Sequence, residues 1–237
     1  PAEVQKHVSD WDTFYATGSE LAAKGYKLTA TVNDSYRVYS NNVSSKWVED
    51  GKLNIDPQFK AWADAEKASY EAGQTTTGDL WSDEWSAGFY PDGKVFAYFG
   101  PAWLINFSMG QDDEKSIAHA GGWGATEGPQ AFYWGGTWIC AATGTDNPTL
   151  VADIMRKMTT DETILKDIVS KDSDCVNNKN VLSSLASDDA FGFSVLGGQN
   201  PFGLFTENVE KIDLSNLSAY DQGCLLYTSP SPRDGAT

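Results

Sequence analysis

Hydrophobic and polar positions follow two spacings along the chain, which predicts helices interleaved with short strands. Apolar residues recur at helical spacing after Ser9-Asp10 and again after Asp56-Pro57, where the polar or proline residue begins the helix. Residues 26–32 alternate between apolar and polar, and residues 94–99 form a compact apolar run, both typical of strands. The first half of the chain therefore predicts mixed helix and strand.

The second half predicts more helices around one long apolar stretch. Residues 131–142 are almost wholly apolar and are interrupted by Gly135-Gly136, which predicts two strands joined by a flexible pivot. Further helices are predicted over 80–89, after Gly100-Pro101, over 148–158, 161–171 and 177–186, and after Asn200-Pro201. Strands alternating with helices indicate the α/β fold class.

Composition narrows the classes of protein that fit this pattern. The 237 residues include 33 Asp and Glu against 17 Lys and Arg, giving a net charge of −16, so nucleic acid is not an expected partner. A hydrophobic content of 41% and an aromatic content of 13% exclude an acidic disordered chain. No apolar run reaches roughly 18 residues, so we expect no transmembrane segment. Two His and three scattered Cys predict neither a metal site nor a cofactor.

The two ends of the sequence need separate treatment. The chain starts at Pro1, so a signal peptide or lipid anchor cannot be read from it. Residues 224–234, Cys-Leu-Leu-Tyr-Thr-Ser-Pro-Ser-Pro-Arg-Asp, match the in-frame translation of a transposon-end adapter used in shotgun sequencing. A natural Pro/Ser-rich tail is the alternative. We expect residues 224–237 to be a non-native tail, which leaves Cys140 and Cys175 in the natural text.

Catalytic groupings are sparse. His7 and His119 both stand in polar text, where a solvated surface position is the simpler interpretation. Asp83 and Glu84 lie beside Trp81 and Trp85, and paired carboxylates flanked by aromatic rings can hydrolyse glycosidic bonds. Acidic pairs on a surface helix are common, however, so this hypothesis stays an alternative.

The aromatic residues are more informative than the acids. A sugar offers an apolar C–H face, which an aromatic ring can cover, and a rim of hydroxyls, which polar side chains can bind. Trp103, Trp134 and Trp138 stand at ends of elements or at glycine-rich joints, where clefts form. For Trp103 and Trp134, core packing remains an equal alternative. For three other tryptophans core packing is favoured: Trp11, Trp47 and Trp62.

Four segments, taken in order, resemble one family. Residues 94–103, Lys-Val-Phe-Ala-Tyr-Phe-Gly-Pro-Ala-Trp, are similar to the strand and Gly-Pro-Trp turn of extracellular solute-binding proteins of carbohydrate ABC transporters, the maltose-binding-protein-like group. Residues 11–14 resemble that family's first helix, 34–36 its ligand-touching loop, and 138–148 its crossover strand and turn. Two departures are the inserted Ala102 and the paired tryptophans around Gly135-Gly136, so the sugar cannot be inferred from the family.

The resemblance implies an architecture and a role. It implies a type II periplasmic-binding-protein-like fold of two lobes joined by a hinge, of which this sequence lacks most of the N-terminal lobe. Residues 1–136 would form the second lobe, 137–205 part of the first lobe, and 206–223 a truncated return to the second. The implied function is a monomeric, non-catalytic receptor that delivers a carbohydrate to the permease subunits of an ABC importer. It would be extracellular, cell-surface or periplasmic, with a lipid anchor upstream of this sequence.

The same resemblance implies which residues meet the ligand. Trp103 and Trp134 would be ring platforms, with Trp138 nearby, and Asp34 and Tyr36 would bind hydroxyls. Further polar contacts would come from Gln199, Asn200 and Asp221. For Gln199 and Asn200 the alternative is a helix start at Pro201, with Asn200 as its cap. Rival functions are a glycoside hydrolase using Asp83 or Glu84 and a lectin-like surface module. The resemblance also favours free, buried thiols at Cys140 and Cys175.

Overall fold

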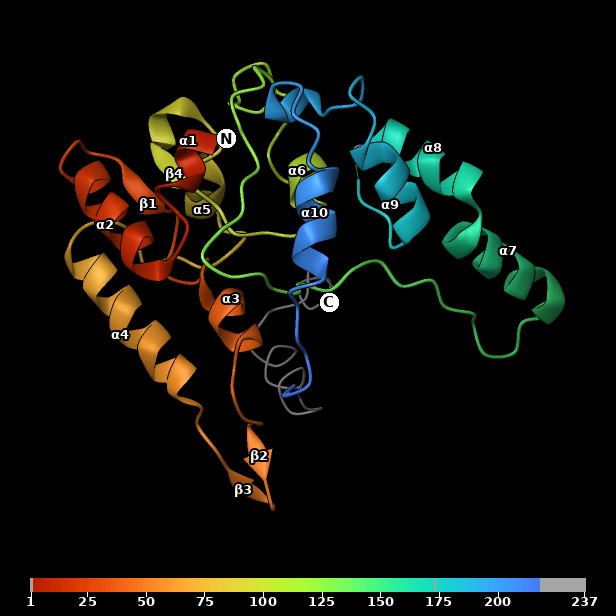
Figure 1. Cartoon of the computed structure of the whole chain (residues 1–237), viewed down its shortest axis with the longest axis horizontal. Helices are drawn as coiled ribbons and strands as arrows, with labels where there is room; N and C mark the ends of the chain where they lie inside the picture. Colours follow the sequence, from red (N-terminus) through yellow and green to blue (C-terminus); the bar gives the residue numbers. More distant parts are fainter. Residues whose placement is uncertain (1, 173, 218–237) are drawn as a thin grey trace.

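The structure is a computed structural model that describes residues 2–172 and 174–217. In Figure 1 the elements of the first hundred residues lie on one side and three helices of the second half lie on the other, with α6 and α10 between them. The described helices and strands mix α and β structure, as predicted, although helices dominate. The elements before residue 100 are α1 (Ala2–Gln5), α2 (Trp11–Ala22), β1 (Lys27–Thr29), α3 (Tyr36–Asn41), β2 (Val48–Glu49), β3 (Lys52–Leu53), α4 (Pro57–Glu71), α5 (Asp83–Ala87), a 3-10 turn η1 (Pro91–Gly93) and β4 (Val95–Ala97).

The sheet of this first part is small. Strands β1 and β4 pair in parallel, with Lys27 opposite Val95 and Thr29 opposite Ala97. Helix α2 packs on β1 and buries Phe14 against Leu28, because these apolar side chains leave water together. The parallel pair therefore joins two segments that lie far apart in the sequence.

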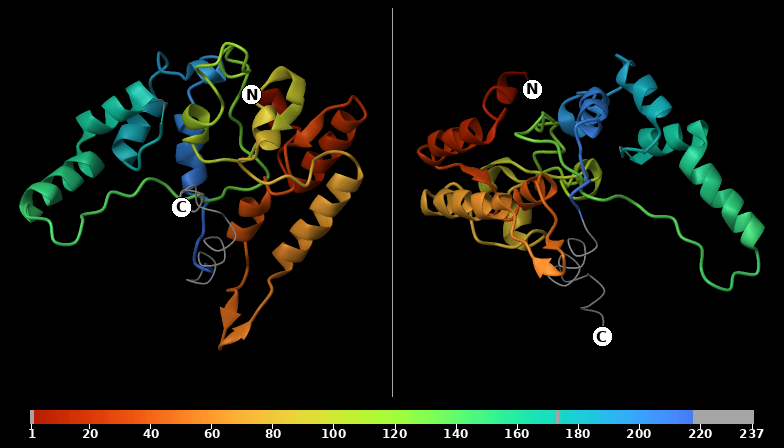
Figure 2. Two further views of the ribbon diagram at one scale, coloured as in Figure 1. Left: turned by 180° about the vertical axis from the view of Figure 1, so that it is seen from behind. Right: turned by 60° about the horizontal axis from the view of Figure 1, so that its bottom comes forward.

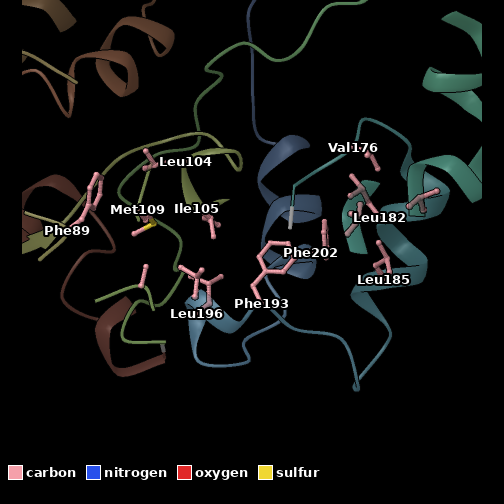
Figure 3. Close-up of a cluster of buried hydrophobic side chains, with 14 of the residues drawn as sticks. Phe89, Leu104, Ile105, Met109, Val176, Leu182, Leu185, Phe193, Leu196 and Phe202 are labelled. Atoms are coloured by element: carbon pink, nitrogen blue, oxygen red, sulfur yellow. The ribbon is translucent and has the colours of Figure 1, made fainter. Parts of the chain in front are cut away.

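A second core connects the two halves of the chain. The elements after residue 100 are α6 (Leu104–Phe107), α7 (Pro148–Thr160), α8 (Glu162–Asp172), α9 (Lys179–Ala186), a 3-10 turn η2 (Ser194–Leu196) and α10 (Phe202–Val209). Figure 3 shows side chains from α6, including Leu104 and Ile105, and from α9 and α10, including Leu185 and Phe202, in one buried cluster. Residues before and after the long segment 125–147 therefore share one hydrophobic core.

Side-chain caps explain why four of the predicted helices begin where they do. The carboxylate of Asp10 accepts a hydrogen bond from the Thr13 N–H, and that of Asp56 accepts one from Gln58. Asp161 and Asn178 cap α8 and α9 in the same way. Each capped helix confirms the corresponding prediction from sequence, to within a few residues.

The prediction of two strands over residues 131–142 is wrong. The segment carries no strand, and its backbone runs extended toward α7 (Figure 1). A strand needs a hydrogen-bonding partner, and Asn41 at the end of α3 and Asn42 directly after it hold the start of this segment instead. Helix α3 and the β2–β3 hairpin, which projects from the body, were not predicted.

Helix α7 stands apart from the rest and packs on α8 (Figure 2). Leu150, Ile154 and Met158, spaced one helical turn apart, are each at least 40% exposed and form an apolar stripe. Across the described ranges, no helix has both the length and the apolar character that a bilayer crossing requires.

Candidate ligand-binding site

Three tryptophans meet at one exposed place, which we call the tryptophan cluster: Trp81, Trp103 and Trp134. The Trp81 and Trp103 rings stack with centroids 5.5 Å apart and planes 20° from parallel. Trp81 also meets Trp134 edge-on at 6.4 Å, and 46% of Trp81 remains exposed. Within the described ranges, none of the three indole N–H groups donates a hydrogen bond. The cluster therefore offers flat apolar faces together with indole N–H donors.

The backbone before each short helix positions these rings. Trp103 caps α6 in an ordinary helical conformation, with φ −67°. Trp81 precedes Ser82, whose hydroxyl accepts the Trp85 N–H at the start of α5. The φ angle of Trp81 is +70°, a left-handed conformation that a bulky residue rarely adopts. Backbone strain of this kind clusters at functional sites, so Trp81 is a candidate that the sequence prediction did not place in the site.

A buried carboxylate, Asp34, supports the cluster through Trp85. Trp85 packs against Trp81 at 4.7 Å and is 2% exposed, and its indole N–H donates to Asp34 at 2.8 Å. The second Asp34 oxygen accepts the N–H of Thr31. Burial raises the pKa of Asp34 to about 7, although both hydrogen bonds lower it. Asp34 is thus fully buried and supports Trp85, and its expected contact with a ligand hydroxyl stays a prediction.

Helix α3 reaches the cluster through Arg37. The Arg37 guanidinium lies 4.8 Å above the Trp134 ring, a cation–π contact. Its neighbour Tyr36 meets Trp62 edge-on at 5.0 Å and Phe59 at 6.2 Å, so its ring packs toward α4. The structure therefore brings Arg37 to Trp134, and the expected contact of Tyr36 with a ligand hydroxyl stays a prediction.

The amides of Gln199 and Asn200 are engaged within the protein. Gln199 accepts the N–H of Ala125 at 2.9 Å and donates to its carbonyl at 2.7 Å. Asn200 donates to the carbonyls of Leu185 and Asp188 and accepts the N–H of Phe202 at the start of α10. These contacts match the structural alternative for Asn200. They place neither amide against the tryptophan cluster.

Two other predicted ligand residues are Trp138 and Asp221. Trp138 is 80% exposed on the extended segment. Asp221 lies outside the described residues, as does the whole expected tail at 224–237. Their assignment to the ligand stays a prediction.

The predicted alternative chemistry finds limited geometric support. Asp83 and Glu84 are both exposed in the first turn of α5, close to Trp81 in sequence. His7 and His119 are exposed, as predicted. Cys140 and Cys175 are free, but Cys140 is exposed, so the expectation of two buried thiols is wrong for it. Most residues between 135 and 147 are exposed like Cys140.

A hollow follows α6, and none of the three cluster tryptophans lines it. It measures about 730 Å³ and is lined by residues 106, 107 and 110–115, including Phe107, whose ring meets Trp103 edge-on at 6.1 Å.

Two residues of the site were not predicted from the sequence. Arg37 carries no recognisable signal there, and Trp81 stands out only as a neighbour of Asp83 and Glu84. An aromatic residue flanked by acids before a short helix is the signal that could have found Trp81.

Comparison with known proteins supports the fold. No family model matches the sequence, and no curated protein matches it. A solved structure described as an extracellular solute-binding protein of family 1 matches with a TM-score of 0.67 and 17% sequence identity. The match covers 99% of this chain and 57% of that chain. The chain thus shares the fold of a solute-binding protein over little more than half of that protein's length.

Proposed function

We propose that this chain is part of a receptor that binds a sugar or oligosaccharide and delivers it to an ABC importer without catalysing a reaction. The observation that carries the proposal is the tryptophan cluster, exposed on a chain with the fold of a solute-binding protein. The match to the solved structure concerns the fold alone, so the evidence for a sugar ligand is the chemistry of the tryptophan cluster.

The chemistry of the cluster suits a pyranose ring. Aromatic faces cover the apolar C–H face of a sugar, and the outer surface of Trp81 remains open to it. The indole N–H groups and the exposed acids Asp83 and Glu84 supply partners for hydroxyls. Trp103 and Trp134 are the proposed ring platforms, with Trp81 between them. Five further residues remain proposed ligand contacts without a described contact to the tryptophan cluster: Trp138, Tyr36, Gln199, Asn200 and Asp221.

The proposed receptor has two lobes that close on the ligand by a hinge. Residues 1–136 would belong to one lobe, 137–205 to the other, and 206–223 would return to the first. Binding energy shifts such an equilibrium only through contacts that improve on closure. In this arrangement the protein acts outside the cytoplasmic membrane, in the periplasm or anchored at the cell surface by an upstream lipid.

Titration calorimetry against a panel of oligosaccharides tests the proposal. We expect saturable binding of at least one sugar, weakened roughly tenfold or more by Trp103→Ala or Trp134→Ala because each variant removes a stacking face. Tyr70→Ala, which truncates an exposed ring on α4, is the matched control and should leave affinity unchanged. If both tryptophan variants bound the sugar as tightly as the wild type, these rings would be excluded as platforms.

The same samples separate the rival functions. A glycoside hydrolase using Asp83 or Glu84 would release reducing sugar from the panel, and Glu84→Gln would stop that release. The proposed receptor releases none. A lectin-like module would bind sugar but would not bind permease subunits. A pull-down with the permease subunits of a carbohydrate ABC importer tests for that interaction.

A further inference from the structure

Arg37 is a half-buried cation that has no counter-ion within residues 2–172 and 174–217. Among the residues that the structure describes, no carboxylate forms an ion pair with its guanidinium. Burial lowers the pKa of Arg37, because the partly covered guanidinium loses hydration. By contrast, Arg156 on α7 pairs with Asp153. A partly desolvated cation without an anion is unfavourable unless another group compensates it.

The protein holds this cation at the tryptophan cluster. Asn41 accepts the Tyr133 N–H at 2.7 Å, and Asn42 donates to the Ala131 carbonyl at 3.0 Å. These two bonds from the end of α3 fasten the segment that carries Trp134, and the Trp134 ring then lies under the guanidinium. Trp134 contacts one face of Arg37, which leaves the planar N–H donors of the fork to bind another group.

The nearest acid along the chain does not neutralise Arg37. Asp34 stands three residues before it, but its two oxygens accept the N–H of Thr31 and the indole N–H of Trp85. The exposed acids Asp79, Asp83 and Glu84 flank Trp81 in the sequence, whereas Arg37 contacts Trp134. The cluster therefore joins one ring that has a cation on it to another ring that has acids beside it in the chain.

We propose that the ligand carries a carboxylate that binds Arg37, and that the receptor accordingly takes uronic-acid sugars. This inference rests on the proposed sugar-binding function and names its substrate class. A guanidinium binds a carboxylate through two parallel N–H···O bonds, a stronger and more directional contact than a bond to a hydroxyl. The sugar ring would lie on the open surface of Trp81, beside Trp134 and within reach of Arg37, with its hydroxyls toward the acids of α5. A chain with net charge −16 repels anions in general, so an acidic ligand needs such a local cation.

The test compares ligands that differ only in charge. Oligogalacturonate, oligoglucuronate and oligomannuronate are titrated into the protein beside their methyl esters and a neutral oligosaccharide panel, with Arg37→Gln, Arg37→Lys and the control Arg156→Gln. For the wild type we expect one acid to bind about ten- to a hundredfold more tightly than its ester. Arg37→Gln should remove that difference, Arg37→Lys should keep part of it, and Arg156→Gln should change nothing.

The outcomes separate this inference from the function on which it rests. Neutral sugars bound as tightly as uronates would overturn the inference and leave the sugar receptor intact. An acid preference that survives Arg37→Gln would exclude Arg37 as its source. If Arg37 only supported Trp134, its loss would weaken acid and ester equally, which the charge-matched pair detects. Failure of every sugar to bind would overturn both proposals. A thermal melt of each variant establishes that it is folded. If Arg37→Gln is unfolded, Arg37→Lys takes its place in the comparison of acid and ester.

Discussion

Two groups of aromatic rings in this protein use the same residue types for different ends. One group, which we call the packed cluster, lies between α2, α3 and β4: Trp11, Phe14, Tyr15, Tyr39 and Phe99. The other is the tryptophan cluster. Phe14 is 1% exposed, whereas Trp81 is 46% exposed.

The polar atoms of the two groups differ as much as their exposure. In the packed cluster the Trp11 indole donates to Gln130 at 2.8 Å and the Tyr15 hydroxyl donates to Glu66 at 2.9 Å. In the part of the tryptophan cluster that the structure describes, the indole N–H groups have no such bonds and no described carboxylate pairs with Arg37. Rings whose polar atoms are hydrogen-bonded within the protein thus belong to a group that stabilises the fold. An exposed group of rings whose polar atoms lack such bonds is a surface suited to a ligand.

The largest expected effect is on the packed cluster. Phe14→Ala should lower the free energy of unfolding by about 3–5 kcal/mol, because it leaves a cavity in a covered core. Urea denaturation measures this change. A loss below about 1 kcal/mol would mean that the packed cluster does not carry the core as described.

The next effect concerns the carboxylate under the tryptophan cluster. The pKa of Asp34 is raised from 3.8 to about 7, so the folded state holds a proton that the unfolded state releases. Stability should therefore be highest near pH 4 and fall as pH rises through 7, by up to about 4 kcal/mol at 1.36 kcal/mol for each unit. Glu66, whose pKa burial also raises, acts in the same direction.

Unfolding measured from pH 4 to 8 checks this dependence. Asp34→Asn keeps an acceptor for the Trp85 indole and should flatten the curve. An unchanged slope in Asp34→Asn would assign the titration to another group, with Glu66→Gln as the variant that tests it.

A smaller effect distinguishes strain at Trp81 from simple packing. Trp81→Gly should be more stable than Trp81→Ala by about 1 kcal/mol, because glycine adopts φ +70° without cost. At Trp103, whose φ is −67°, the order should reverse, with alanine the more stable by roughly 0.5–1 kcal/mol. The same order at both positions would mean that Trp81 carries no backbone strain.

The smallest effect is expected at Trp138. Because 80% of this residue is exposed, Trp138→Ala should change the free energy of unfolding by less than about 0.5 kcal/mol. Calorimetry of the same variant shows whether Trp138 nevertheless contacts sugar. A large loss of stability would mean that the extended segment packs more tightly than its exposure indicates.

Local sequence predicted much of the helical structure and little of the pairing. Caps such as Asp56 and Asp161 act within a few residues, so the starts of α4 and α8 could be predicted. Residues 131–142 have strand-like composition, but a strand depends on a partner elsewhere in the chain. Asn41 of α3 binds this segment instead of another strand. No local pattern in the sequence indicates which of these partners the segment meets.

The site was predicted in part for the same reason. Trp103 and Trp134 could be named from their positions at glycine-rich joints, and the structure brings both to Trp81. The burial of Asp34 under Trp85 and the approach of Arg37 to Trp134 join residues about 50 and 100 positions apart, which spacing in sequence cannot reveal.

The most direct test of the central claim is fluorine NMR of protein labelled with 5-fluorotryptophan. The nine tryptophans give separate resonances, assigned by single substitutions. Adding the sugar that binds best in calorimetry should shift the signals of Trp81, Trp103 and Trp134 and leave that of Trp11, in the packed cluster, unchanged. Shifts confined to Trp11 or to other tryptophans outside the tryptophan cluster would contradict the account.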